Sequence, residues 1–284
     1  MPVIAPARRD AARTAPLDVA AGPDETLDAI CGGEVKVLQS QTGYRFNLDP
    51  VLLAHFAVKW PGPVRGALID LGTGCGVIPL ILARKFDRRQ LTALEVQPSL
   101  YELAQRNVHL NRCERRISLV LGDLRKVDRK LPAGGFAQVV CNPPYRAMEA
   151  GRLNPHEEKA IARHEVLCSL EDVARAANHL LKERGALSVV FPAARLAELV
   201  EVLRGKRLEP KLLQLVHPRP DRPAKLLLLQ AVKGGRANLE VLPPLVVHEG
   251  QGFSPEVRAM LEEGAPGEAG AATGAPWPLE TTPA

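Results

Sequence analysis

The sequence predicts an α/β fold in which a mostly parallel β-sheet carries helices on both faces. Short apolar runs rich in β-branched residues alternate with stretches of helical periodicity, as expected for strands buried between helices. A glycine-rich turn follows the first of these runs. The last two runs flank a loop, RPDRPA, that is too short for a crossover helix, so they should pair as an antiparallel hairpin.

Each apolar run has the length of a strand, and the stretches between the runs place apolar residues on one helical face. The helix expected from Leu170 has a capping-box-like start, Ser169 with Asp172 three residues later. The predicted strands are Ala67–Gly72, Leu91–Val96, Ile117–Asp123, Ala137–Asn142, Ala186–Pro192, Leu212–Pro218 and Lys225–Val232. The predicted helices are Ile78–Phe86, Pro98–Asn111, Leu170–Lys182 and Ala193–Leu203.

The composition shows a mild basic excess. The 284 residues carry a net charge of +5 with a pI of about 9.0, which favours an anionic partner such as nucleic acid. The five cysteines have no CxxC spacing and the histidines no metal-ligand spacing, so we expect free thiols, a cytoplasmic location and no metal. No apolar run approaches the roughly 18 residues of a membrane span. The sequence does not indicate an oligomeric state.

The glycine-rich turn, DLGTGCG from Asp70 to Gly76, predicts a ligand-binding loop. Gly72, Gly74 and Gly76 allow positive φ and close backbone approach, and the following helix start supplies unpaired N–H groups. Such a loop could hold a pyrophosphate or the carboxylate end of another cofactor. The carboxylate of Asp70 suits a cationic group instead, such as the ammonium of a methionine moiety.

Two further acidic residues follow the next two strands. Glu95 ends the second strand, where a carboxylate can accept hydrogen bonds from both ribose hydroxyls. Asp123, in a Gly-Asp pair after the third strand, could accept one from an adenine amino group. Each acid alone could be a helix N-cap or a solvated loop residue, but three acids at successive strand ends favour a nucleoside site.

The motif NPPY, residues 142–145, ends the fourth predicted strand. A rigid strand end is the simple explanation, because prolines cannot extend a β-ladder. Alternatively, the prolines hold two acceptors in place, the Asn142 amide oxygen and the Pro143 carbonyl. Both could accept N–H bonds from one planar amino group and localise its lone pair, while Tyr145 stacks on a flipped base.

Together, DLGTGCG, Glu95, the Gly-Asp pair and NPPY resemble the motifs of class I S-adenosylmethionine-dependent amino-methyltransferases. The resemblance implies a Rossmann-like, seven-stranded, mostly parallel sheet with a C-terminal antiparallel hairpin, and S-adenosyl-L-methionine as cofactor. It also implies that the acceptor is an adenine N6 or a glutamine amide. The implied cofactor residues are Asp70, Gly72, Thr73, Gly74, Gly76, Glu95, Asp123 and Leu124, and the implied catalytic residues are Asn142, Pro143, Pro144 and Tyr145.

Softer matches narrow the resemblance to the bacterial valine-tRNA adenine-N6 methyltransferases, which methylate adenine 37 next to the anticodon. The segment GYRFNLDPVLLAHF, residues 43–56, is similar to the part of those enzymes that closes over the cofactor, which implies cofactor or lid roles for Phe46 and Asp49. A core or cap role for these two residues remains open. ARHE, residues 162–165, and LEVLPPLVVHEG after the last strand are similar to the same family. The implied substrate is tRNA.

Basic residues in these regions are candidates for RNA contacts. Arg163 and His164 lie in ARHE, whereas Arg219, Arg222 and Lys225 lie in or beside the loop of the predicted hairpin. Contacts with phosphate there would be electrostatic and sensitive to salt. A solvated basic face is the alternative.

We expect a single methyltransferase domain over residues 24–255, between disordered tails at 1–23 and 256–284. Its expected parts are an N-terminal segment closing the cofactor site (24–64), a Rossmann-like core (65–235) and a C-terminal extension (236–255).

Three other functions remain alternatives. The first is a glutamine-amide methyltransferase acting on a peptide-chain release factor, although that family usually carries a longer helical N-terminal domain. The second is a DNA adenine-N6 methyltransferase, although nothing resembles a separate target-recognition domain. The third is a non-catalytic RNA-binding relative, against which the intact Asp70, Glu95 and Asn142 argue.

Overall fold

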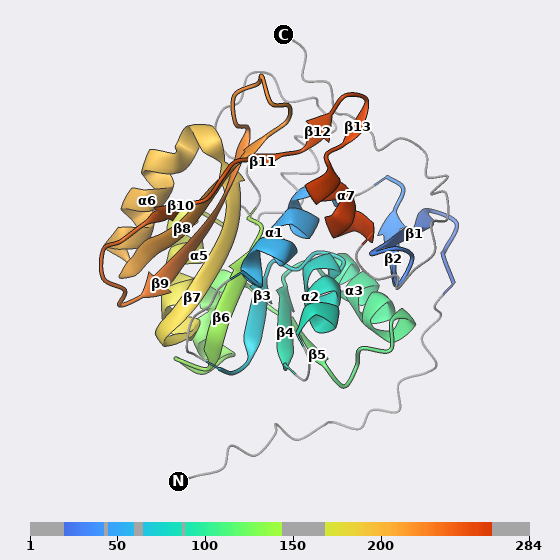
Figure 1. Ribbon diagram of the computed structural model, residues 1–284. Helices are drawn as coiled ribbons and strands as arrows, with labels where there is room; N and C mark the ends of the chain where they lie inside the picture. The colour runs from blue at the N-terminus through green and yellow to red at the C-terminus, as the bar shows by residue number, and fades with distance from the viewer. Residues whose placement is uncertain (1–19, 43–44, 60–64, 87–88, 144–167, 263–284) are drawn as a thin grey trace, which may run out of the picture.

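The computed structural model describes residues 20–42, 45–59, 65–86, 89–143 and 168–262. Nine strands in these residues form one central sheet (Figure 1). The longer strands are β3 (Leu68–Leu71), β4 (Leu91–Glu95), β5 (Ile117–Leu121), β6 (Phe136–Cys141), β7 (Leu181–Pro192), β8 (Leu208–His217) and β9 (Leu226–Lys233). Two short strands, β10 (Glu240–Val241) and β11 (Leu245–Val246), join them.

The strand order is β10-β8-β9-β7-β6-β3-β4-β5, with β11 as a further parallel partner of β8. Neighbours from β5 to β7 pair in parallel, whereas β9 is antiparallel to both β7 and β8. The predicted mostly parallel sheet with a C-terminal antiparallel hairpin is therefore confirmed. The sequence did not predict β10 and β11, because two residues paired to β8 carry no periodicity of their own.

Helices cover both faces of the sheet, and the pleat of the strands explains how. In β3, Leu68 belongs to the apolar core on one face and its neighbour Ile69 to the core on the other. The first face carries α1 (Asp49–Ala57), α2 (Val77–Lys85) and α3 (Pro98–Leu110); the second carries η1 (Leu124–Arg129), α5 (Leu170–Leu180) and α6 (Leu196–Gly205), which the short turn η2 (Ala193–Arg195) precedes. The predicted capping box of Ser169 and Asp172 is present at the start of α5.

A hairpin of β1 (Glu25–Ile30) and β2 (Val35–Ser40) stands outside the main sheet, beside α3 (Figure 1). The sequence did not predict it. Arg106 of α3 binds the carboxylate of Glu25 on β1, with Nη1 to Oε1 at 2.6 Å. Contacts with α3, rather than a strong strand pattern, therefore fix this hairpin.

Helix α1 lies over the middle of the sheet and is buried along its whole length (Figure 1). Two glutamines of the sheet supply donors to carbonyls at its C-terminal end. Gln138 Nε2 donates to the Ala57 carbonyl at 2.7 Å, and Gln230 Nε2 donates to the Phe56 carbonyl at 3.1 Å. These bonds satisfy helix-end carbonyls that water cannot reach and thereby fix α1 on the sheet.

The expected C-terminal tail needs correction. Residues 256–262, assigned to a disordered tail, belong to helix α7 (Pro255–Glu262), which follows a hairpin of β12 (His248–Glu249) and β13 (Gly252–Phe253). Val257 and Met260, three residues apart on one helical face, bury their side chains in the core that contains α1. Residues 1–19 and 263–284 lie outside the described residues. Within the part of the chain that the structure describes, no helix is long and apolar enough to cross a membrane.

Candidate active site

Three neighbouring strands direct residues to one place at the carboxyl edge of the sheet. Parallel pairing sets the last residue of β3 beside the last residue of β6 and the penultimate residue of β4. The next residue along each of the three strands therefore lies in one row at this edge, and these residues are Gly72, Asn142 and Glu95. The chain connections diverge between β3 and β6, and this is where open α/β sheets usually bind ligands.

The glycine loop leaves open space above this row. Gly72 and Thr73 donate their backbone N–H groups to the Leu94 carbonyl at 2.9 and 3.0 Å, which ties the loop to the end of β4. Gly72 has a φ of 73°, and a side chain added there would meet no atom within 4 Å. Gly76, with a φ of 90°, precedes α2. The exposed, open position at Gly72 therefore lets a ligand approach the loop closely.

Asp70 lies on β3 directly before the loop and is fully buried. Among the described residues, neither of its carboxylate oxygens has a hydrogen-bond partner of ordinary geometry. Burial raises the pKa of Asp70 to about 7, the nearby Thr73 hydroxyl opposes this shift, and the charge of Glu95 adds to it. A buried carboxylate without a partner is costly, so this residue is suited to a cationic or hydrogen-bond-donating ligand.

Glu95 is also buried, and the backbone already uses both of its oxygens. Oε2 accepts from the Gly74 N–H at 2.8 Å, and Oε1 accepts from the N–H groups of Val96 and Gln97, both at 2.9 Å. The carboxylate thus holds the glycine loop against the end of β4, a role that the sequence did not reveal. Its remaining lone pairs are those available to the predicted ribose hydroxyls.

Asp123 caps η1 with its side chain. Its Oδ1 accepts from the Arg125 N–H at 2.8 Å, and its Oδ2 pairs with the Arg125 guanidinium at 2.8 Å. The N-cap interpretation is therefore correct for this acid, and an adenine would share it with Arg125. A shallow pocket beside it is formed by the ends of three strands and is lined by Gly72, Leu94, Val96, Gly122, Asp123 and Leu124.

The NPPY motif begins in the same row. Asn142 is half-buried and Pro143 is buried, directly after β6, all of whose residues are buried. The strand that leads to these two residues therefore lies within the core. The other predicted residues of this region, Pro144, Tyr145, Arg163 and His164, lie outside the described residues.

Phe46 and Asp49 lie before and at the start of α1, which packs against α2. Phe46 is buried, and its N–H donates to the Gln39 side-chain oxygen at 3.0 Å. The N–H of Asp49 donates to Asn47 Oδ1 at 3.0 Å. Burial raises the pKa of the Asp49 carboxyl, and the Asn47 side chain beside that carboxyl opposes the shift. A carboxylate in the first helical turn also interacts favourably with the positive end of the helix dipole. Part of the position of Asp49 therefore has a structural explanation.

Arg219, Arg222 and Lys225 are exposed in and beside the loop between β8 and β9. Because β8 runs parallel to β7 and β6, this loop lies at the same edge of the sheet as Asn142. Arg219 Nη1 donates to the Gly250 carbonyl at 2.8 Å, which ties the loop to the β12–β13 hairpin. The loop thus places three exposed cations at this edge of the sheet.

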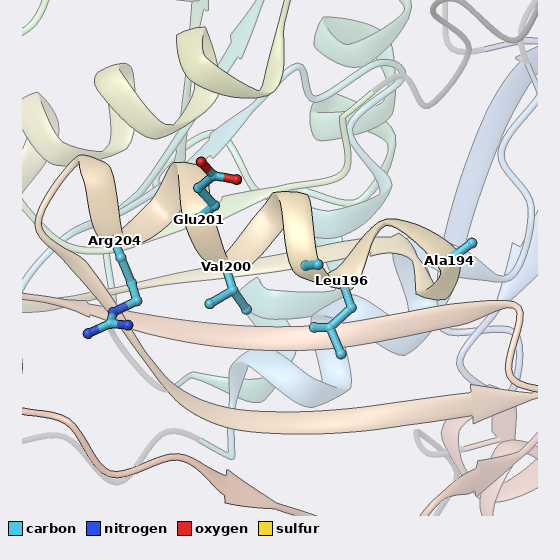
Figure 2. Close-up of a pocket in the computed structure, with 6 residues that line it drawn as sticks. Ala194, Leu196, Val200, Glu201 and Arg204 are labelled. Atoms are coloured by element: carbon cyan, nitrogen blue, oxygen red, sulfur yellow. The ribbon is translucent and has the colours of Figure 1, made fainter.

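A second hollow runs along the outer face of α6 (Figure 2). Its lining residues are Ala194, Leu196, Ala197, Val200, Glu201 and Arg204. Helix α6 packs on the face of the sheet opposite α2, so this hollow is separate from the row at the glycine loop. We assign it no part in the candidate site. Among the described residues, no group of three or more side chains could hold a metal ion.

Sequence reasoning missed one buried polar residue near the loop, Asn107 of α3, whose side-chain amide donates to the Cys75 carbonyl at 2.9 Å. A signal was present in the sequence, because this asparagine interrupts the apolar face formed by Leu103, Ala104 and Val108. Buried polar residues inside an apolar helical face need hydrogen-bond partners from elsewhere in the fold.

Comparisons with known proteins agree with this geometry. The model of the methyltransferase small domain family matches residues 49–200, more than half of the chain. A tRNA1(Val) (adenine(37)-N6)-methyltransferase of Vibrio campbellii is 25% identical over 223 residues, which cover 78% of this chain and 89% of that protein. A protein of the same name from Porphyromonas gingivalis is 29% identical over 230 residues, with the same coverage.

The crystal structure of a predicted O-methyltransferase from Agrobacterium tumefaciens superposes with a TM-score of 0.60 at 27% identity, and covers 76% of this chain and 97% of that one. This similarity confirms the predicted fold class. The curated relatives confirm the resemblance that the sequence motifs indicated.

Proposed function

Because this chain belongs to the methyltransferase small domain family, we propose that it transfers a methyl group from S-adenosylmethionine to N6 of an adenine in tRNA. The observation that carries the proposal is the Asn142–Pro143 pair beside the glycine loop. The curated relatives, which match most of the chain, are named for adenine 37 of a valine tRNA, so this is the proposed position. Family membership confirms the predicted class of enzyme, and S-adenosylmethionine is the cofactor of that class.

The residues at the glycine loop fit this cofactor, which supplies an activated methyl group when bound. Asp70 offers a buried carboxylate, without a partner among the described residues, that can bind an ammonium group. The open space above Gly72 allows close approach of a ligand, and Leu124 lines a small pocket beside it that also contains Asp123. Glu95 and Asp123 complete the proposed set as ribose and adenine contacts, together with Thr73, Gly74, Gly76, Phe46 and Asp49.

The proposed chemistry at the acceptor follows from two oxygen atoms. The lone pair of an adenine amino group is delocalised into the ring, which makes the nitrogen a poor nucleophile. The Asn142 amide oxygen and the Pro143 carbonyl would each accept an N6–H bond and draw the nitrogen out of the ring plane toward the methyl donor. The methylated nitrogen is briefly a cation and then loses a proton to water, so no side chain has to act as a base. In this proposal Pro144 keeps the loop rigid and Tyr145 stacks on the base.

The proposed RNA contacts surround this acceptor site. Arg219, Arg222 and Lys225 provide positive charge at the same edge of the sheet, and Arg163 and His164 follow the NPPY motif in the sequence. We propose that one domain from residue 24 to residue 262 contains the whole site, with residues 24–64 closing the cofactor side. The cysteines among the described residues are free thiols, which fits the reducing cytoplasm where we place the activity.

The test is to supply the protein with S-adenosylmethionine labelled in the methyl group, together with bulk tRNA, DNA or peptide-chain release factor in separate reactions. We expect label in tRNA, as N6-methyladenosine at position 37 of valine tRNA. The matched control is a valine tRNA transcript with guanine at position 37, which should remain unlabelled. Label in the release factor or in DNA would replace the proposal with one of the two alternative methyltransferases.

A further inference from the structure

Helix α3 completes the open edge of strand β2 with two asparagine side chains. Asn107 accepts from the Leu38 N–H at 2.7 Å and donates to the Leu38 carbonyl at 3.0 Å. Asn111 makes the same pair of bonds with Lys36, at 2.9 and 2.6 Å. The spacings match, because four helical residues rise about 6 Å and two strand residues about 6.6 Å. Two side-chain amides thus take the place of a neighbouring strand.

Asn107 differs from Asn111 in its third hydrogen bond. Asn107 Nδ2 also donates to the carbonyl of Cys75, inside the glycine loop, at 2.9 Å. Asn111 Nδ2 instead donates to the Asn107 carbonyl of its own helix, at 2.8 Å. Asn107 is fully buried, and only a side-chain amide offers the one acceptor and two donors that its three partners require.

The glycine loop is consequently held from two sides at two adjacent residues, Gly74 and Cys75. Glu95 accepts the N–H of Gly74, and Asn107 donates to the carbonyl of Cys75. The first contact comes from the end of β4, and the second comes from a residue that also holds β2. The position of the loop therefore depends on the N-terminal hairpin as well as on the sheet.

The hairpin also reaches the segment before α1. Gln39 follows Leu38 on β2 and is buried. Its side-chain oxygen accepts from the Phe46 N–H at 3.0 Å, and its Nε2 donates to Asp28 on β1 at 2.7 Å. A continuous series of short hydrogen bonds thus runs from the glycine loop through Asn107, β2 and Gln39 to Phe46.

We propose that Asn107 is a positioning residue that makes the N-terminal hairpin part of the cofactor site. Its hydrogen bonds fix the glycine loop relative to β2. The Gln39 side chain on β2 then fixes the position of Phe46. The inference rests on the proposed function only in that the ligand of the loop is S-adenosylmethionine or its demethylated product. Asn111, which holds the same strand without contacting the loop, is the matched control.

The experiment compares Asn107→Ala with Asn111→Ala in the full chain. Calorimetry with S-adenosylhomocysteine should show a Kd at least about tenfold higher for Asn107→Ala and within about threefold of wild type for Asn111→Ala. In methyl transfer, Asn107→Ala should raise the KM for the cofactor and leave the KM for tRNA unchanged. Hydrogen exchange gives the decisive readout. The ligand should slow exchange at Leu38 and Phe46 in wild type and in Asn111→Ala, but only within the glycine loop in Asn107→Ala.

Equal Kd values for the two variants, or no effect of the ligand on hairpin exchange in wild type, would overturn the inference. If Asn107→Ala does not fold, Gln39→Leu provides the test. It removes the hydrogen bond to the Phe46 N–H and leaves the bond between Asn107 and Cys75 intact. That variant should lose ligand protection at Phe46 while keeping it at Leu38, and unchanged protection at Phe46 counts against the inference. A wild-type protein that binds no S-adenosylhomocysteine would instead contradict the proposed function.

Discussion

Two parts of the same sheet edge differ in burial and in charge, and we propose that they bind their ligands by different physical means. The cofactor edge, formed by the ends of β3, β4 and β5, buries its acids Asp70 and Glu95 and holds its loop with backbone hydrogen bonds. The acceptor edge, formed by the end of β6, the β8–β9 loop and the β12–β13 hairpin, exposes Arg219 and Arg222. The first can bind by short contacts in a low dielectric. The second can attract an anionic chain over a longer range, in a way that salt weakens.

Substituting Asn142 should have the largest effect, because it should impair the acceptor edge and leave the cofactor edge unchanged. Asn142→Ala removes one of the two proposed acceptors for the N6 amino group, and we expect kcat to fall at least about 100-fold. The Kd for S-adenosylhomocysteine should stay within about threefold of wild type, because the cofactor edge is unchanged. Steady-state methylation at saturating tRNA measures kcat, and calorimetry measures the Kd. Turnover at the wild-type rate would remove Asn142 from the mechanism.

Asp70→Asn should act on the cofactor edge alone. Loss of a charged hydrogen bond to an ammonium group should raise the Kd for S-adenosylhomocysteine about 10- to 100-fold. The KM for tRNA should not change. Thr73→Val is a useful control in the same loop, because it removes a neutral hydroxyl and should have a smaller effect on the Kd.

The pH dependence gives a second test of the same carboxylate. Its pKa of about 7 lies above the value of about 3.9 in an unfolded chain, so the folded protein disfavours the ionised form. The unfolding free energy of the ligand-free protein should therefore fall as pH rises from about 4 to about 7, and Asp70→Asn should lack this loss. Ligand affinity should change in the opposite sense and be up to about tenfold weaker at pH 6 than at pH 8, because protonation removes the charge that binds the ammonium. Affinity independent of pH in this range would contradict the assignment of Asp70.

The acceptor edge should respond to salt. Removing two cations with Arg222→Ala and Lys225→Ala should weaken tRNA binding several-fold and reduce the slope of log K against log salt by about 1 for each phosphate that the variant no longer binds. The Kd for S-adenosylhomocysteine should be unchanged. Arg204→Ala, which removes a cation from α6 on the far face of the sheet, is the control. An equal effect of Arg204→Ala would mean that only the overall charge matters.

The same contrast explains what the sequence could and could not predict. The residues of the cofactor edge lie in contiguous sequence motifs. Strand length and turn chemistry therefore predicted strands β3 to β6, the glycine loop and the row of Gly72, Glu95 and Asn142. The β1–β2 hairpin and the strands β10 and β11 depend on contacts between distant segments, such as Asn107 with Leu38 and β11 with β8. Helix α7 was not predicted because the sequence that follows it is rich in Gly, Ala and Pro, and the helix was assigned to the same tail. The backbone partners of Glu95 and the Arg125 partner of Asp123 also require three-dimensional knowledge, because sequence shows an acid but not what it already binds.

The smallest expected effect concerns the anchoring of α5, which begins at the end of the segment that carries Pro144, Tyr145 and the ARHE residues. Ser169→Ala removes one half of the capping box with Asp172 and should lower the unfolding free energy by about 1 kcal/mol in denaturant titrations. Glu171→Ala, in the same helical turn, should cost less because it leaves the cap in place. If the cap serves only stability, methyl transfer at saturating tRNA should be unchanged in Ser169→Ala. A fall in kcat without any change in the Kd for S-adenosylhomocysteine would show that the acceptor edge, unlike the cofactor edge, depends on the cap of α5.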